Sequence, residues 1–176
     1  MLFEKMIVCR LNWFLEYHNV VHVSQSCFRE RRKTTDHLLR LHAAIHKSMT
    51  NKHNVFSVFI DIEKAYGMVN KKVFLPKLLS YGISGRMFHF IPTFRSKGTI
   101  QVSIGSTLSM NKELENVTLQ GSVLSLILFS LVINHLPKRI TSDATLCADD
   151  FCFWKCGSDI TFLNQLCQRS LSKVCK

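Results

Sequence analysis

The sequence predicts an α+β fold, in which helices back a sheet of antiparallel strands. Apolar residues recur at three- and four-residue spacing near both ends of the chain, as on the buried face of a helix. Residues 55–62 and 144–154 are instead short runs rich in β-branched and aromatic residues, and the second indicates a hairpin. The first run ends at Asp61, and the second contains Asp149 and Asp150. The same two segments therefore carry the predicted sheet and the candidate site.

The composition favours a globular, strongly basic protein. The chain has 176 residues, with 23 Lys and Arg against 12 Asp and Glu, which gives a net charge of +11. Hydrophobic residues make up 47% of it, which excludes a disordered tail. The positive surplus favours nucleic acid as a partner over an anionic membrane surface, and an ordinary basic protein is the alternative. The longest nearly apolar run, 123–133, is too short to span a bilayer.

The cysteines indicate a reducing compartment. There are seven of them, an odd number, and the first residues lack the basic start and apolar run of a signal peptide. We therefore expect an intracellular protein, nuclear or cytoplasmic, with free thiols rather than disulfides. No zinc is expected, because the spacing of Cys147, Cys152 and Cys156 fits no common zinc motif, and His42 with His46 lacks two further ligands.

The first third of the chain predicts two helices joined by a basic loop. Residues 2–18 show helical spacing, with Asn19 as a plausible stop. The loop 24–36 follows, and Thr35 or Asp36 is expected to cap the second helix. Cations just before a helix can bind phosphate, because the free backbone N–H groups add to the attraction. An ordinary solvated charge run is the alternative.

Residues 55–62 predict a strand that ends in a carboxylate. Apolar residues at both alternate positions indicate that both faces of this strand are buried. The charge of Asp61 at its end is costly unless a metal ion, hydrogen bonds or a wet cleft compensates it. A carboxylate in a solvated turn is the alternative for each acidic position taken alone. Two acidic strand ends brought together instead suggest a site for divalent metal ions.

Two short helices are expected next. The first ends near Gly82, a natural C-terminal stop, and Ser84 can cap the second. Pro76 and Pro92 fall inside these helical patterns, so each should kink or shorten its helix.

The remaining segments predict a hairpin, an apolar helix, a second hairpin and a final helix. Residues 99–104 alternate as a strand, turn at 105–106 and pair with a strand over 113–118. An apolar helix then runs to about Pro137. The second hairpin carries the two carboxylates at its tip, and an amphipathic helix over 160–174 follows it.

Four motifs stand in these segments in a fixed order. The pattern QSCFR…TTDHL in 25–38 resembles a fingers motif that commonly reads QSGFRKGRSTTDHL, and FIDIEKAY in 59–66 resembles motif A, commonly FxDIEKAYD. Residues 120–125, QGSVLS, match the core of motif B, and 148–150, ADD, match the xDD of motif C. With these motifs the chain resembles, over about 2–171, the reverse transcriptase of non-LTR retrotransposons, most closely the jockey-like group.

The resemblance implies a right-hand polymerase fold. Residues 1–54 would form part of the fingers with the entry helices, and 55–176 would form a palm sheet backed by helices, with motifs A, B and C. The implied activity is RNA-directed synthesis of DNA, with an RNA template, a DNA primer and deoxynucleoside triphosphates as partners. No membrane partner is expected.

The resemblance also assigns the site. Two Mg²⁺ ions, for which Mn²⁺ can substitute, would hold the attacking 3′ oxygen and the leaving pyrophosphate, because hard cations need oxygen ligands. The catalytic metal ligands would be Asp61, Asp149 and Asp150. The residues around template and nucleotide would be Arg29, Arg32, Ile62, Tyr66, Gln120 and Gly121.

These substrate-binding residues have different expected roles. The backbone carbonyl of Ile62 would face a metal ion, and either Arg29 or Arg32 would hold the triphosphate, because a guanidinium fork suits phosphate oxygens. Tyr66 would lie under the incoming sugar and reject a 2′-hydroxyl, and a packed core aromatic is the alternative. Gln120 and Gly121 would line the template and nucleotide pocket.

The chain also departs from the family pattern. Gly67 replaces an Asp of motif A, Cys27 and Arg31 stand where Gly is usual, and 117–119 replace the Gly-Val-Pro of motif B. No motif D, thumb or endonuclease is recognisable. We therefore expect a truncated or decayed copy that keeps its carboxylates and loses processive synthesis. The alternatives are a catalytically inactive nucleic-acid-binding remnant and a relic without a stable fold; template preference and oligomeric state stay open.

Overall fold

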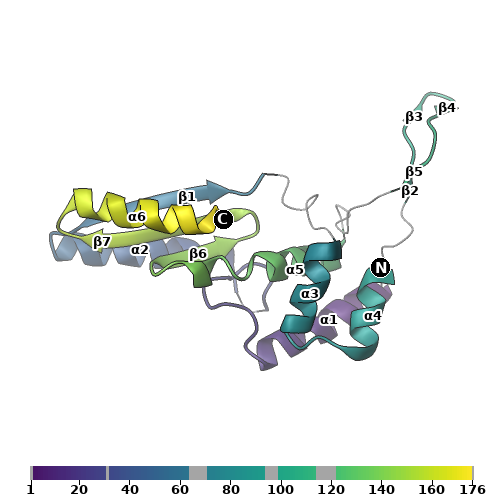
Figure 1. The fold of residues 1–176 in the computed structure, drawn as a ribbon, viewed down its shortest axis with the longest axis horizontal. Helices are drawn as coiled ribbons and strands as arrows, with labels where there is room; N and C mark the ends of the chain where they lie inside the picture. The colour runs from purple at the N-terminus through teal and green to yellow at the C-terminus, as the bar shows by residue number, and fades with distance from the viewer. Residues whose placement is uncertain (1, 31, 64–70, 94–98, 114–121, 176) are drawn as a thin grey trace. The chain divides into compact units, whose positions relative to one another are not determined.

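The computed structural model describes residues 2–30, 32–63, 71–93, 99–113 and 122–175 (Figure 1). The chain divides into two compact units. One contains residues 1–8 and 64–132, and the other contains residues 9–63 and 133–176. Helices and antiparallel sheets are both present, which confirms the predicted α+β class. Within the described residues, no helix is both long enough and apolar enough to cross a membrane.

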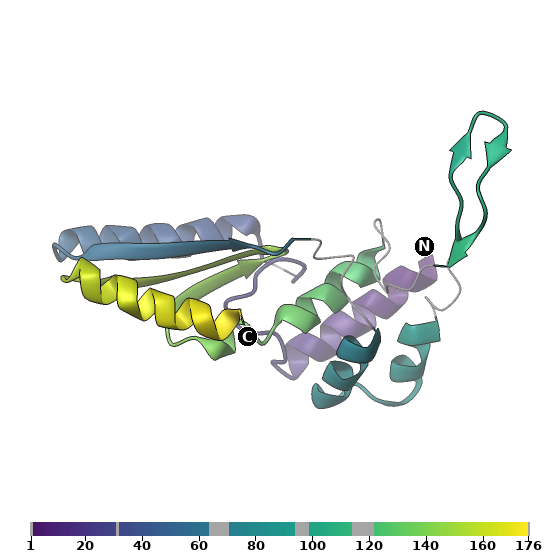
Figure 2. The ribbon, with the colours of Figure 1, turned by 45° about the horizontal axis from the view of Figure 1, so that its top comes forward.

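A three-stranded antiparallel sheet forms the centre of the second unit. Its strands are β1 (Asn54–Asp61), β7 (Asp150–Gly157) and β6 (Asp143–Cys147), in the order β1-β7-β6. Helix α2 (Thr34–Thr50) lies on one side of the sheet and α6 (Ile160–Val174) on the other (Figures 1 and 2). The predicted strand, the predicted hairpin and the predicted last helix are all present.

Burial in this sheet differs between the central and the edge strand. The central strand β7 buries Phe151, Cys152, Phe153 and Trp154 in succession, so both of its faces are covered. No residue of β1 is buried, and Phe59 is 72% exposed. The expectation that both faces of β1 are buried was therefore wrong, because among the described strands β1 lies at the edge of the sheet, with a neighbour on one side.

The loop between α1 (Leu2–Tyr17) and α2 runs along the other edge of the sheet. Gln25 forms a parallel bridge with Leu146 of β6. The backbone N–H of Leu146 donates to the carbonyl of Ser24 at 2.8 Å, and that of Ser26 donates to the carbonyl of Leu146 at 3.4 Å. Ser24, Gln25 and Ser26 are all buried. The first part of the fingers motif is therefore attached to β6.

An acidic side chain accepts backbone hydrogen bonds at the start of both α2 and α6. Helix α2 follows Lys33, its N-cap, and the carboxylate of Asp36 accepts a hydrogen bond from the backbone N–H of Lys33 at 2.9 Å. The prediction that Thr35 or Asp36 is the N-cap was wrong, because Asp36 acts from the third helical position. Helix α6 has Asp159 as its N-cap, which accepts from two backbone N–H groups.

The other unit contains two short helices and all but the last residue of the apolar helix α5 (Val123–Ile133). Helix α3 (Lys71–Ser80) ends as predicted, with Gly82 at a φ of 79°, and Pro76 lies inside it. Helix α4 (Gly85–Thr93) begins directly after Ser84.

The start of α5 is tied to the first turn of the chain. The carboxylate of Glu4, which is 9% exposed, accepts from the hydroxyl of Ser122 and from the backbone N–H of Leu124 at 3.2 Å. A carboxylate at a helix N-terminus satisfies free N–H groups and suits the helix dipole. This contact therefore fixes where α5 begins.

Four two-residue strands replace the continuous strand predicted over 99–104. Strand β2 (Thr99–Ile100) pairs with β5 (Lys112–Glu113), and β3 (Ser103–Ile104) pairs with β4 (Thr107–Leu108). The turn at Gly105 and Ser106 is confirmed, with Gly105 at a φ of 62°. Between the two ladders the side-chain oxygen of Ser109 accepts from the backbone N–H of Val102 at 2.9 Å, which interrupts regular pairing. The rest of the predicted partner strand, beyond residue 113, lies outside the described residues.

Candidate active site

Two of the predicted carboxylates lie opposite each other at one end of the sheet. Asp61, the last residue of β1, pairs in register with Asp150, the first residue of β7. Directly opposed residues of an antiparallel pair project from the same face with their Cβ atoms about 5 Å apart, and like charges placed this way destabilise the sheet. Both residues are exposed to solvent. This pairing therefore favours a bound cation more than it favours the stability of the sheet.

The third carboxylate belongs to the turn that follows. Cys147 and Asp150 are paired, so Ala148 and Asp149 form a two-residue connection between β6 and β7. Ala148 has a φ of 53°, a left-handed conformation that is rare for a residue with a Cβ. The backbone N–H of Ile62 donates to the carbonyl of Asp149 at 3.1 Å, which joins the turn to the end of β1.

A cavity of about 460 Å³ lies between this end of the sheet and α2. Asp61, Asp150 and Cys147 line it from the strands, and His37 and Leu41 line it from the helix. Asp61, Asp150 and Cys147 are paired in one row across the three strands, and directly opposed residues project from the same face of a sheet, which explains why they reach one cavity. The carboxylates therefore border a space that a small ligand can enter.

A second group of side chains with possible metal-binding atoms lies beside the same cavity. Among the described residues, the one group of three His, Cys, Asp or Glu ligand atoms within 4.8 Å of one another is Cys27, His37 and Cys147. The carboxylates of Asp61 and Asp150 face each other by register and are not part of this group.

Cys27 and Cys147 form a disulfide, with their Cα atoms 4.9 Å apart. The other five cysteines are free. The expectation of free thiols was therefore wrong for this pair. The two residues are separated by 120 positions in the sequence, and only the pairing of the loop with β6 brings them together.

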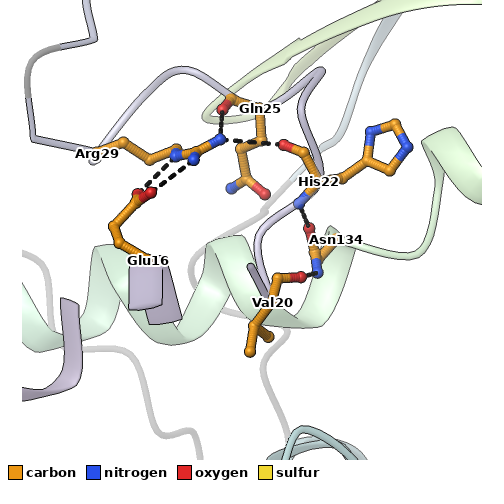
Figure 3. Close-up of polar contacts among 6 residues, drawn as sticks. All are labelled: Glu16, Val20, His22, Gln25, Arg29 and Asn134. Carbon is orange, nitrogen blue, oxygen red and sulfur yellow. Dashed lines mark hydrogen bonds and ion pairs between the residues drawn. The ribbon is translucent and has the colours of Figure 1, made fainter. Parts of the chain in front are cut away.

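Arg29 is held by contacts within its own loop and with the helix before it. Its Nε and Nη2 atoms donate to the carboxylate of Glu16, both at 2.7 Å, and its Nη1 donates to the backbone carbonyls of His22 at 3.3 Å and Gln25 at 3.1 Å (Figure 3). The hydrogen bond from Arg29 lowers the pKa of Glu16, against the opposing effect of burial. The guanidinium therefore acts as a brace for the loop.

Asn134 holds the beginning of the same loop. Its side chain is fully buried, accepts from the backbone N–H of His22 at 2.7 Å and donates to the carbonyl of Val20 at 2.8 Å (Figure 3). Sequence reasoning missed both Asn134 and Glu16. For Glu16 a signal was present, because a carboxylate in the last turn of a helix opposes the helix dipole and needs a cation. For Asn134 the sequence contains no signal of this kind.

Arg32, the second candidate for the triphosphate, is exposed. Its backbone N–H donates to the carbonyl of Arg29 at 3.4 Å, so it follows directly on the braced part of the loop. Its charge also helps to lower the pKa of Glu16, after the larger effects of Arg29 and burial.

Three of the predicted substrate-binding residues lie outside the described residues: Tyr66, Gln120 and Gly121. Ile62 is described and half-buried, and its bond to Asp149 uses its N–H group. The roles assigned to these four residues stay predictions.

Comparison with known families tests the overall assignment. A family model described as reverse transcriptase (RNA-dependent DNA polymerase) matches residues 2–173. A comparison with curated proteins found no match. The matched range contains every carboxylate, arginine and motif residue discussed above, and it covers nearly the whole chain. The chain therefore belongs to the reverse transcriptase (RNA-dependent DNA polymerase) family.

Proposed function

We propose that this chain is the palm and part of the fingers of an RNA-directed DNA polymerase from a jockey-like non-LTR retrotransposon. It would join a deoxynucleotide to the 3′ end of a primer on an RNA template. Family membership supports the class of reaction. The location of the active site is supported by one observation: Asp61 and Asp150 lie opposite each other at the border of a cavity.

The donor set suits hard divalent cations. Asp61, Asp149 and Asp150 offer carboxylate oxygens at one end of the sheet, which are the ligands that Mg²⁺ prefers. When bound there, two such ions would supply activation of the primer hydroxyl and neutralisation of the leaving pyrophosphate. The residues of the chain keep the carboxylates in place: register pairing holds Asp61 against Asp150, and Ile62 holds the Asp149 backbone.

The nucleotide would approach from the fingers side. Of the two candidate arginines, Arg29 uses its guanidinium on Glu16 and on two carbonyls, whereas Arg32 is exposed. We therefore assign the triphosphate contact to Arg32, with Arg29 supporting its loop. Tyr66, Gln120, Gly121 and the carbonyl of Ile62 would complete the pocket around sugar, template base and metal.

Primer extension on an RNA template with Mg²⁺ tests this function. Asp61→Asn and Asp149→Ala should each reduce nucleotide incorporation by at least two orders of magnitude, because they remove metal ligands. Asp143→Asn is the matched control, since Asp143 lies at the other end of β6, opposite Trp154. Equal incorporation by all four proteins would refute the site. RNA binding without extension, unchanged by Asp149→Ala, would instead identify an inactive nucleic-acid-binding remnant.

A further inference from the structure

Three ligand-bearing side chains from three segments converge beside the carboxylate pair. Cys27 comes from the loop after α1, His37 from the start of α2, and Cys147 from the end of β6. Their ligand atoms all lie within 4.8 Å of one another. We propose that, in the reduced protein, Cys27, His37 and Cys147 bind a Zn²⁺ ion.

His37 gives the strongest independent support. It is 7% exposed, and both of its ring nitrogens are buried without a hydrogen-bond partner among the described residues. Buried polar groups are nearly always paired, because an unpaired one loses its hydrogen bonds to water without replacement. A metal bond at one nitrogen would give this side chain the partner that it lacks. The imidazole also lines the cavity that Cys147 borders.

The distances suit a tetrahedral ion. Zinc binds thiolate sulfur at about 2.3 Å and imidazole nitrogen at about 2.0–2.1 Å, so tetrahedral ligand atoms stand about 3.5–3.8 Å apart. In this structure the two sulfurs are bonded to each other and the imidazole nitrogen lies within 4.8 Å of both, so after reduction the sulfurs move apart to reach that spacing. The 4.9 Å between the Cα atoms of Cys27 and Cys147 lets both thiolates reach one ion after a side-chain rotation. Three protein ligands leave the fourth position for water.

The ligand types select the metal. Two thiolates and one imidazole suit a borderline-soft cation such as Zn²⁺, whereas Mg²⁺ prefers oxygen. The site is therefore chemically distinct from the carboxylate set of Asp61 and Asp150, even though both border the same cavity. It would join the loop, α2 and β6 at one point.

The disulfide and the zinc site are alternative states of the same cysteines. A phosphine reductant supplies two electrons to the Cys27–Cys147 bond, two protons from water complete the thiols, and the phosphine leaves as its oxide. Binding of Zn²⁺ then releases both thiol protons as the two sulfur–metal bonds form. Oxidised protein therefore cannot bind the ion in this way.

Cobalt titration of the reduced, metal-free protein tests the proposal, because Co²⁺ replaces Zn²⁺ and is coloured. We expect one equivalent of Co²⁺ to give a thiolate-to-cobalt charge-transfer band that Zn²⁺ abolishes. Cys27→Ser should remove the band and His37→Gln should weaken the affinity at least tenfold. Cys156→Ser, which changes an exposed thiol on β7, is the matched control and should leave the band unchanged.

The opposite results would overturn the proposal. A band that survives Cys27→Ser, or the absence of a band in the reduced wild-type chain, excludes the site. The pair His42 and His46, whose rings lie 6.4 Å apart, is the rival location. Cobalt bound there would lack the thiolate band and would be lost in His42→Gln, which also counts against the proposal.

Alkylation of the wild-type chain avoids any dependence on the folding of variants. With iodoacetamide and peptide mass mapping of the reduced chain, Zn²⁺ should slow modification of Cys27 and Cys147 at least tenfold. The exposed thiols of Cys9 and Cys175 should react at the same rate with and without zinc. Equal rates at Cys27 in both conditions would overturn the assignment.

Discussion

Asp61 and Asp150 place two like charges directly opposite each other at the end of the sheet. Without a bound cation this arrangement lowers the stability of the strand pair. We therefore predict that Asp61→Asn raises the free energy of unfolding in a metal chelator, by up to about 1 kcal/mol, although it reduces incorporation when Mg²⁺ is present. Urea denaturation of both proteins in the chelator measures the difference.

The control for this gain is Asp143→Asn, because Asp143 faces Trp154 rather than a second carboxylate. It should leave the unfolding free energy within about 0.5 kcal/mol of the wild type. If Asp61→Asn destabilises the protein relative to this control, the two carboxylates do not repel each other, and the electrostatic argument for a cation site fails.

Ala148 occupies a left-handed conformation at the tip of the β6–β7 hairpin, with a φ of 53°. A Cβ in this region costs about 1–2 kcal/mol, whereas glycine adopts it freely and loses about 0.5–1 kcal/mol of chain entropy. We predict that Ala148→Gly raises the unfolding free energy by up to about 1 kcal/mol. Ala148→Val should lower it, because a branched Cβ increases the crowding.

The reference for this substitution is Ala144→Gly in the interior of β6, where Ala144 is buried. Glycine there removes a packed methyl group and adds chain flexibility, so it should destabilise the protein. Thermal or urea unfolding of the variants measures these differences in stability. An Ala148→Gly protein that loses as much stability as Ala144→Gly would show that the turn does not need a positive φ.

At the scale of elements, the sequence predicts what local patterns determine. The periodicity over 160–174 predicts the bounds of α6, and the hairpin over β6 and β7 follows from two adjacent strand patterns. The position of β1 in the sheet was not predictable, because an apolar run fits a central strand and an edge strand equally well. The order of the strands depends on pairing across about 90 residues of chain. Phe59 is exposed because this pairing places β1 at the edge.

The loop between α1 and α2 depends on one ion pair. Arg29 contacts Glu16 with two hydrogen bonds and also satisfies the carbonyls of His22 and Gln25. We predict that Arg29→Met destabilises the protein more than Glu16→Gln does, because it also leaves two carbonyls without a donor. Arg29→Lys should recover only part of the loss, since an ammonium lacks the planar fork. Urea denaturation at neutral pH ranks the three variants.

The same ion pair should make stability depend on pH. The hydrogen bond from Arg29 holds the pKa of Glu16 below its ordinary value of 4.5. A carboxyl with a lowered folded-state pKa stabilises the protein above its unfolded pKa, and that contribution is lost as the pH falls through the folded pKa. The wild type should therefore lose stability below about pH 4.5 more steeply than Glu16→Gln. The effect should be small, because the Glu16 side chain is 39% exposed and solvent screens the pair. Parallel slopes for both proteins would contradict it.

At the scale of the whole molecule, the meeting of the acidic strand ends was predictable and the meeting of Cys27 with Cys147 was not. Asp61 and the pair Asp149 and Asp150 stand at strand ends within motifs of fixed order. Their residue types and positions therefore predict that they lie close together. Cys27 and Cys147 meet only because the loop pairs with β6, and no spacing rule connects positions 120 apart in the sequence. The contacts of Arg29 with Glu16 and with two carbonyls were also not predictable, because they depend on how the loop folds against the preceding helix.

The net charge of +11 leads to a prediction for the whole chain. Binding to an RNA–DNA hybrid should weaken linearly with salt on logarithmic axes, because each phosphate contact releases a counterion. Arg32 is exposed at the end of the braced loop, so Arg32→Gln should reduce the slope by about one unit. Arg169→Gln removes an equal charge from the exposed surface of α6 and should leave the slope unchanged. Fluorescence anisotropy over a salt series measures both, and equal slopes for the two variants would mean that the loop does not contact the nucleic acid backbone.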